Sequence, residues 1–383
     1  MKPVSTESDL ERVMDLFRTF SENVVRDLPL YRHLSASIAE DPEVASLLLL
    51  APPEQQTVPV LLLAAVHDVL LAGESDPLRD WYDTITDEPR RLGDGVDDPW
   101  PHFRRLALEN PGVVERLETR SVQTNEVGRC APLVAAFIHL ARRAPGAPPD
   151  GFRPLSLVEL GTSAGLNLLV DRYGYRFEPP GLGEPRVANP DAPLMIDCDL
   201  RGEGAPLLVD DRPHVASRVG VDLNPLDLTE PDDARWLVAC QWPDEIDRTH
   251  RIRAAMALAR ADAPTLVRGD AVQEVAALVD AVPGHALPVV FATWALAYLP
   301  EQRQRDLLAV LDEIGSDRDL NLVFAEQPVQ ITGMPVPARP DGRGDGPPTA
   351  LVAYDWRDGV RTEERLGDLH PHGRWLEWLA VSD

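Results

Sequence analysis

The second half of the chain carries the pattern that most restricts what it can fold into: short apolar runs separated by helix-like stretches. Strands in the middle of a parallel sheet have this pattern, because helices cover the sheet and both faces of each strand are buried. The sequence therefore predicts an α/β fold with a doubly wound, mostly parallel sheet. The apolar runs are residues 155–160, 219–223, 265–267, 288–293 and 321–325.

Two further segments are expected to add strands. Residues 173–213 carry short strand-like runs around a turn, which predicts a β insertion after the first helix-like stretch. Near the end of the chain, two apolar runs flank Asp358-Gly359, a dipeptide that favours the tight turn of an antiparallel hairpin.

The first part of the chain is expected to be helical, because its apolar residues recur at helical spacing and no convincing strand interrupts them. A length of 383 residues exceeds one ordinary core, and the Pro- and Gly-rich stretch 144–154 is the best linker. We expect a helical N-terminal domain over residues 1–143 and the α/β domain over residues 144–383.

The charged residues exclude several functions. Lys2 is the only lysine, which excludes P-loop nucleotide-binding proteins and enzymes that form a lysine Schiff base. The 63 acidic residues outnumber the 37 basic ones and give a net charge of −26. This excess indicates adaptation to a halophilic cytoplasm, where salt screens the repulsion, or an acidic recognition surface. It also disfavours nucleic acid as a partner without excluding it.

The cysteines and the apolar runs indicate a compartment. The cysteines lie far apart, lack the spacing of a zinc site and suggest a reducing environment, so we expect no metal. No secretion signal and no apolar run of membrane-spanning length occurs, which predicts a cytoplasmic protein that does not bind membranes. The oligomeric state does not follow from the sequence. The cysteines are Cys130, Cys198 and Cys240.

The strongest functional signal is the sequence Glu-Leu-Gly-Thr-Ser-Ala-Gly-Leu-Asn from Glu159 to Asn167. A strand ends at an acidic residue, a Gly-rich turn follows, and a helix is expected to begin. Gly161 and Gly165 allow the backbone to approach a ligand, and a helix start offers free amides. An acidic strand end suits a cationic ligand better than a pyrophosphate. The alternative is a tight turn that binds nothing.

This segment resembles the Gly-rich motif of S-adenosylmethionine-dependent methyltransferases, whose variant of the Rossmann fold also ends in an antiparallel pair of strands. The resemblance implies a class I methyltransferase-like domain that binds S-adenosylmethionine. Ser163 stands where the motif has its central glycine. The implied cofactor-binding residues in this segment are Glu159, Gly161, Ser163, Gly165 and Asn167.

The same segment matches G-x-S-x-G, the nucleophile elbow of α/β-hydrolases. Asp270 and His285 follow Ser163 in the order that a triad of this class requires. The mostly helical first 150 residues argue against this alternative, because the elbow normally follows several strands.

Two other expected strands also end in acidic residues. Asp222, followed by Asn224, ends the second strand, where an acidic side chain binds ribose hydroxyls in nucleoside-binding Rossmann folds. By the methyltransferase resemblance, Asp270 and the amide of Ala271 would hold the adenine. Either aspartate can instead be a helix N-cap. Because parallel strands end at one edge of a sheet, we expect these side chains to share a site.

Residues that could contact a methyl acceptor lie in two segments. Trp294 and Tyr298 follow the fourth strand and are four apart, which predicts one helix face. Asn125, Glu126 and Arg129 form a polar patch at the start of an apolar helix, which predicts a lid with Arg129 on a carboxylate and Glu126 as a base. Core packing and a capped surface helix are the respective alternatives.

His67 interrupts an apolar helix and is the second candidate base; a satisfied core histidine is the alternative. Phrases spread along nearly the whole chain also resemble the family named domain of unknown function 2332. That resemblance implies a helical N-terminal region and a methyltransferase-like region, and it supplies no established reaction. The phrases are residues 28–31, 39–43, 61–67, 124–129, 159–167, 171–173, 222–227 and 293–298.

These observations favour a methyltransferase that acts on a small-molecule acceptor. A non-catalytic protein that binds a nucleoside or S-adenosylmethionine is the alternative from another class. A hydrolase that uses Ser163 is the third hypothesis.

Overall fold

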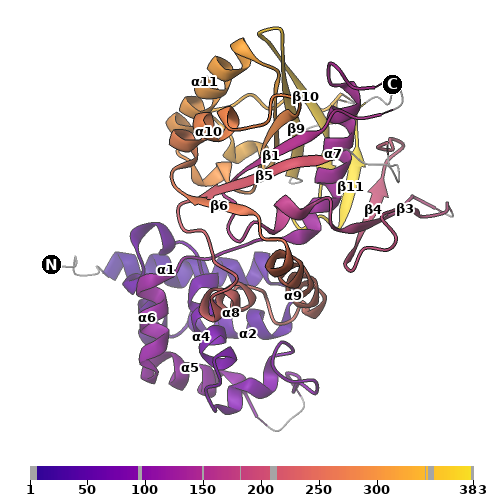
Figure 1. Ribbon diagram of the computed structural model, residues 1–383. Coiled ribbons are helices and arrows are strands. Elements are labelled where there is room, and N and C mark those ends of the chain that lie inside the picture. The colour runs from indigo at the N-terminus through magenta and orange to yellow at the C-terminus, as the bar shows by residue number, and fades with distance from the viewer. Residues whose placement is uncertain are drawn as a thin grey trace. The chain divides into compact units, whose positions relative to one another are not determined.

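The computed structural model describes residues 7–93, 97–148, 151–181, 183–207, 214–340, 342–343 and 349–380. The chain divides into two compact units (Figure 1). The helical unit comprises Met1–Thr124 and Leu228–Arg253, and the sheet unit comprises Asn125–Asp227 and Ala254–Asp383. This division differs from the boundary expected at residue 143, because residues 125–143 group with the sheet and a later segment returns to the helices.

The described residues of the helical unit form helices and no strands. Helix α4 is buried on all sides, and Asp68 within it accepts hydrogen bonds from Arg116 and Arg235, which ties three helices together. The amide of Leu30 donates to Asp244 Oδ1 at 3.0 Å, which holds the returning segment in this unit. The helices are α1 (Glu7–Thr19), α2 (Pro29–Ile38), α3 (Pro42–Ala45), α4 (Val60–Leu71), α5 (Pro99–Glu109), α6 (Pro111–Thr119) and α8 (Pro231–Ala239), and α9 (Ile246–Ala261) begins here.

The sheet unit is built on one eleven-stranded sheet with the order β3-β2-β4-β11-β10-β9-β8-β7-β1-β5-β6. Strands β6, β5, β1, β7 and β8 are mutually parallel neighbours, and β9 and β10 continue the sheet as an antiparallel pair. The strands are β1 (Leu155–Leu160), β2 (Gly174–Glu178), β3 (Arg186–Ala188), β4 (Met195–Arg201), β5 (Val215–Asp222), β6 (Thr265–Arg268), β7 (Leu287–Thr293), β8 (Leu320–Glu326), β9 (Thr349–Arg357), β10 (Val360–Leu369) and β11 (Trp375–Trp378).

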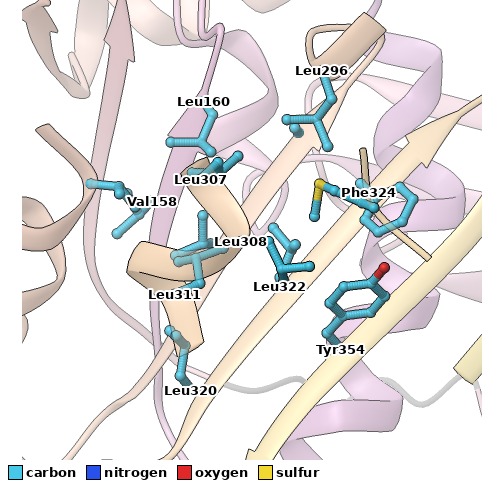
Figure 2. Close-up of a cluster of buried hydrophobic side chains, with 14 of the residues drawn as sticks. Val158, Leu160, Leu296, Leu307, Leu308, Leu311, Leu320, Leu322, Phe324 and Tyr354 are labelled. Atoms are coloured by element: carbon cyan, nitrogen blue, oxygen red, sulfur yellow. The ribbon is translucent and has the colours of Figure 1, made fainter. Parts of the chain in front are cut away.

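Helices cover both faces of the central strands. On one face, α10 (Ala271–Asp280) and α11 (Glu301–Asp317) pack their valines and leucines against β1, β7 and β8. Figure 2 shows the leucines of α11 beside those of β1 and β8. On the other face lies α7 (Cys130–Arg143), whose Phe137 ring meets Phe291 of β7 edge-on at 5.4 Å. The neighbours of Phe291, Val290 and Ala292, belong to the core on the α10 and α11 face. Alternate residues of β7 are therefore buried on opposite faces, as the apolar runs predict.

Several expected details differ from the structure. Where a helix is expected to begin after the Gly-rich turn, a 3-10 turn covers only Leu166–Leu169. The apolar helix expected after the polar patch is present as α7, but residues 120–126 before it are not helical. The terminal hairpin is present, with φ angles of 50° at Asp358 and 76° at Gly359 that fit its tight turn.

The expected insertion supplies β2, β3 and β4, and β11 joins them to the sheet by pairing parallel to β4. Residues 208–213 of the insertion and Lys2 lie outside the described residues. Among the described residues, no helix combines the length and the apolar character needed to cross a bilayer.

Candidate functional site

The candidate site lies where the order of the parallel strands reverses. The chain extends the sheet from β1 through β5 to β6 on one side, and then through β7 to β8 on the other. In doubly wound sheets, ligands bind beyond the carboxyl ends of the strands at this switch point. We name the residues that follow these ends, 159–167, 222–224, 268–271, 293–298 and 326, the strand-end site.

The turn after β1 has an unusual backbone. Gly161, Ser163 and Gly165 all have positive φ angles, of 72°, 54° and 73°. A Cβ atom on Gly161 would lie 2.5 Å from the Cβ of Ala295, so the turn after β1 touches the turn after β7. Unlike the two glycines, Ser163 carries a side chain, and a serine in this backbone region stores strain of about 1–3 kcal/mol. Strained residues of this kind concentrate at functional sites.

Glu159 supports the turn from within the core. Its Oε2 accepts a hydrogen bond from Thr162 Oγ1 at 2.7 Å, and its Oε1 accepts one from Asn167 Nδ2 at 3.3 Å. Burial raises the pKa of Glu159 to about 8, although the bonds from Thr162 and Asn167 oppose the shift. The carboxyl group is therefore mostly neutral at pH 7, and it positions the turn instead of offering a charge to a cation.

Asp222, at the end of β5, connects to the same turn. Its Oδ2 accepts a hydrogen bond from the amide of Ser163 at 2.8 Å, and its Oδ1 accepts one from the amide of Asn224 at 2.8 Å. The side chain of Asn224 accepts from Arg268 at 2.9 Å. Of the acidic residues expected at the site, Asp222 is thus the one that combines contact with the Gly-rich turn and partial exposure.

Asp270 is the N-cap of α10, which Ala271 begins. Its Oδ1 accepts from the amides of Val272 and Gln273, at 2.9 and 3.1 Å, and it forms an ion pair with Arg303. Burial raises the pKa of Asp270, but Arg303 and the backbone bonds outweigh this and hold the pKa below its usual range. The alternative of a helix cap therefore accounts for this residue.

The segment from Asn125 to Arg129 belongs to the sheet unit and reaches the strand-end site. Asn125 Oδ1 accepts from the amide of Leu166 at 2.9 Å, and Arg129 Nη1 donates to the carbonyl of Thr293 at 3.1 Å. Glu126 caps the 3-10 turn Val127–Arg129 by accepting from the amide of Gly128 at 3.0 Å. The three side chains do not share a helix face, because residues 120–126 are not helical.

Trp294 follows β7 and faces Arg129. Its φ angle is 53°, and the guanidinium of Arg129 lies 5.9 Å from the centre of its ring. The expected helix with Trp294 and Tyr298 on one face is wrong, because only Leu296–Tyr298 form a short 3-10 turn. Tyr298 is instead 77% exposed. Leu223, which follows β5, is 66% exposed, and Val329, which follows β8, is 78% exposed.

Three buried polar atoms of the strand-end site have no hydrogen-bond partner: Ser163 Oγ, Trp294 Nε1 and Glu326 Oε2. A buried polar atom left unpaired costs about 1–3 kcal/mol. The three atoms share one edge of the sheet. Glu326 is not among the residues expected from the sequence, although it ends an apolar strand run as Glu159 and Asp222 do.

His67 lies in the helical unit and is fully buried. Its Nδ1 is 3.0 Å from the carbonyl of Ala239, and its Nε2 is 2.7 Å from Thr84 Oγ1. Burial lowers the pKa of His67 to about 4, so the ring is neutral at pH 7 and donates through Nδ1 because a carbonyl can only accept. These contacts describe a satisfied core histidine.

The hydrolase triad is not assembled. His285 precedes β7, whose first residue pairs with Leu155 at the start of β1, whereas Ser163 follows the end of β1. The intervening strand length places the two residues about 20 Å apart. Among the described residues, no group of three or more His, Cys, Asp or Glu side chains is arranged to hold a metal ion.

The fold and the site define an α/β protein with a large, mostly parallel sheet and a cluster of polar residues at its strand ends. The profile of the family described as "uncharacterized protein conserved in bacteria (DUF2332)" matches residues 14–378. The chain belongs to this family. No curated protein matches the sequence.

Proposed function

We propose that this protein is an S-adenosylmethionine-dependent methyltransferase that acts on a small molecule. The observation that carries the proposal is the strained turn Gly161–Gly165, which Asp222 holds at the switch point of the sheet. The parallel strands also have the nucleotide-binding order 3-2-1-4-5, counted as β6, β5, β1, β7 and β8. When bound, the cofactor supplies a methyl group activated by a positively charged sulfur.

The residues at the turn fit such a cofactor. A carboxylate has about four lone-pair positions, and the amides of Ser163 and Asn224 use two of those on Asp222. The others can accept the two ribose hydroxyls. The buried, unpartnered hydroxyl of Ser163 can bind a polar group of the cofactor beside the turn. Asn125 binds the backbone amide of Leu166, and Asn167 binds the side chain of Glu159, so both residues help to shape the turn.

The acceptor is expected to be partly apolar. Tyr298, Leu223 and Val329 expose large apolar surface at the same edge, and desolvating them favours a ligand with aromatic or aliphatic surface. Arg129 is held by the carbonyls of Thr293 and Pro371 beside Trp294, so this segment closes one side of the acceptor region. A non-catalytic binding protein would use the same cofactor residues and show no methyl transfer.

Calorimetric titration with S-adenosylhomocysteine tests the proposal, in about 2 M KCl so that surface repulsion is screened. We expect micromolar binding to the wild-type protein, and loss of binding in Asp222→Ala. The matched control is Asp280→Ala, which removes the same charge from the exposed end of α10. Absence of binding to the folded wild-type protein would contradict the proposal.

A further inference from the structure

Glu326 holds the backbone with one carboxyl oxygen and leaves the other unused. Its Oε1 accepts hydrogen bonds from the amides of Ala295 and Leu296, at 2.8 and 2.9 Å. These bonds fix the turn after β7. The whole residue is only 1% exposed, and its Oε2 is buried without a hydrogen-bond partner. The backbone contacts of Glu326 therefore use one of its two carboxyl oxygens and leave Oε2 without an assigned role.

The unused oxygen belongs to the same edge as the proposed cofactor turn. Ala295, whose amide binds Glu326, is the residue that a Cβ on Gly161 would strike. The preceding residue, Trp294, pairs its own amide with the carbonyl of Ala325 at 3.1 Å and leaves its indole N–H buried without a partner. The unpaired indole N–H of Trp294 and the unpaired Oε2 of Glu326 thus belong to residues on neighbouring segments beside Gly161.

The charges around Glu326 suit a group that gains and loses a proton. Burial raises the pKa of Glu326 to about 7, and the backbone amides of Leu296, Ala295 and Ala297 and the charge of Arg129 restrain the rise. Among the described residues, Arg129 and the phenol of Tyr298 interact electrostatically with Glu326. Neither Arg129 nor Tyr298 changes its charge near pH 7, so Glu326 is the group among the three that can exchange a proton near this pH. A base is most effective when its pKa is near the working pH.

Resting on the methyltransferase function proposed above, we propose that Glu326 is the general base that deprotonates the methyl acceptor, while the indole N–H of Trp294 binds the acceptor atom. The acceptor class follows from this pair. It carries an ionisable O–H or S–H group, such as a phenol or a thiol, on a partly apolar body, because the acceptor atom needs one lone pair for the indole N–H and another for the methyl carbon.

The step balances without a further reactant. The acceptor atom forms a bond to the methyl carbon as the carbon–sulfur bond breaks, and that electron pair remains on sulfur, which becomes neutral. The proton on the acceptor atom passes to Glu326 Oε2. Because Oε1 stays bound to the amides of Ala295 and Leu296, the carboxyl group keeps its orientation while it takes up the proton.

Sinefungin tests this assignment without a known acceptor. In this analogue an amine-bearing carbon replaces the methyl sulfonium, so its ammonium occupies the position of the methyl group. Calorimetric titrations compare sinefungin with S-adenosylhomocysteine at about pH 7.5, where Glu326 is mostly ionised. A charge-assisted hydrogen bond to Glu326 predicts about 10- to 100-fold tighter binding of sinefungin to the wild-type protein.

Glu326→Gln should abolish this preference, because an amide keeps an acceptor for the two backbone bonds and loses the charge. Glu313→Gln, on the exposed face of α11, is the matched control and should retain the preference. If Glu326→Gln does not fold, the wild-type protein gives the same test. Its preference for sinefungin should shrink about tenfold or more at about pH 5.5, where Glu326 is protonated.

Each outcome decides the assignment. If both ligands bind the wild-type protein without a preference for sinefungin, or if the preference persists in Glu326→Gln, the role of Glu326 is wrong while the methyltransferase function stands. If neither ligand binds the wild-type protein, the proposed function and the base assignment fail together.

Discussion

Several side chains at the strand-end site use one polar atom to hold the backbone and keep another for a partner. Glu326 binds two amides through Oε1, and Asp222 binds two amides with only part of its acceptor capacity. Glu159 differs, because both of its oxygens are used within the core. This difference separates the residue that shapes the turn from the residues that can meet a ligand.

Gly161→Ala tests the contact between the turns after β1 and β7. The added methyl group would clash with Ala295 and would also sit at a positive φ angle. The matched control is Gly146→Ala, whose φ of 79° is similar but whose Cβ would meet nothing within 4 Å. We expect the control to lose about 1 kcal/mol and Gly161→Ala to lose about 1–3 kcal/mol more, measured by urea unfolding. Equal losses would contradict the close packing.

Glu159→Gln tests the buried carboxyl group under the turn. Because its pKa rises from 4.5 to about 8 on folding, the folded state binds the proton more tightly. Stability from this group is present below pH 4.5 and is lost as the pH rises through about 8, a loss on the order of 5 kcal/mol. Unfolding free energies between about pH 5 and pH 9 should therefore fall less steeply in Glu159→Gln than in the wild-type protein or Glu313→Gln. An unchanged slope would show that Glu159 is ionised.

At the scale of elements, the sequence predicts the central strands well and the segments between them less well. Runs such as 155–160 and 321–325 match β1 and β8 closely, because strands buried on both faces need continuous apolar residues. The expected helix after β1 fails because Gly165 has a left-handed backbone and the side chain of Asn167 binds Glu159. These constraints come from tertiary contacts that periodicity does not register.

Long-range pairing also escaped prediction. The parallel pairing of β11 with β4 joins Trp375 to Asp199, residues far apart in the sequence with no local signal that links them. The break before α7 has the same origin, since Asn125 and Glu126 bind backbone amides instead of continuing a helix. At the site, the acidic strand ends are recognisable from the sequence. Which of their oxygens remain unpaired is not.

His67→Gln tests the interior of α4. The pKa of this histidine falls from 6.5 to about 4 on folding, so the unfolded state binds the proton more tightly between these values. Stability from His67 is present above pH 6.5 and is lost as the pH falls through about 4, a loss on the order of 3 kcal/mol.

Urea unfolding from about pH 7 to pH 4 should therefore show a shallower loss of stability in His67→Gln than in the wild-type protein. His250→Gln, at an exposed position of α9, is the control and should keep the wild-type slope. A wild-type slope in His67→Gln would mean that the ring is protonated in the folded protein.

At the scale of the whole molecule, the net charge of −26 dominates the electrostatics. Repulsion among the acidic residues weakens when the screening length falls from about 10 Å in 0.1 M salt to about 3 Å in 1 M salt. We expect the midpoint of thermal unfolding to rise by several degrees over this range of KCl and then to level off. A steady rise with no levelling would instead indicate general exclusion of salt from the protein surface, and no rise would contradict salt adaptation.

The proposed cofactor site consists of Asp222 and the turn from Gly161 to Gly165. The most direct measurement is a crystal structure of the full chain grown with S-adenosylhomocysteine. We expect density for the ligand against this turn, with the ribose hydroxyls on Asp222 and the sulfur directed toward Trp294 and Glu326. A ligand bound elsewhere, or a strand-end site that stays empty at saturating ligand, would contradict the account.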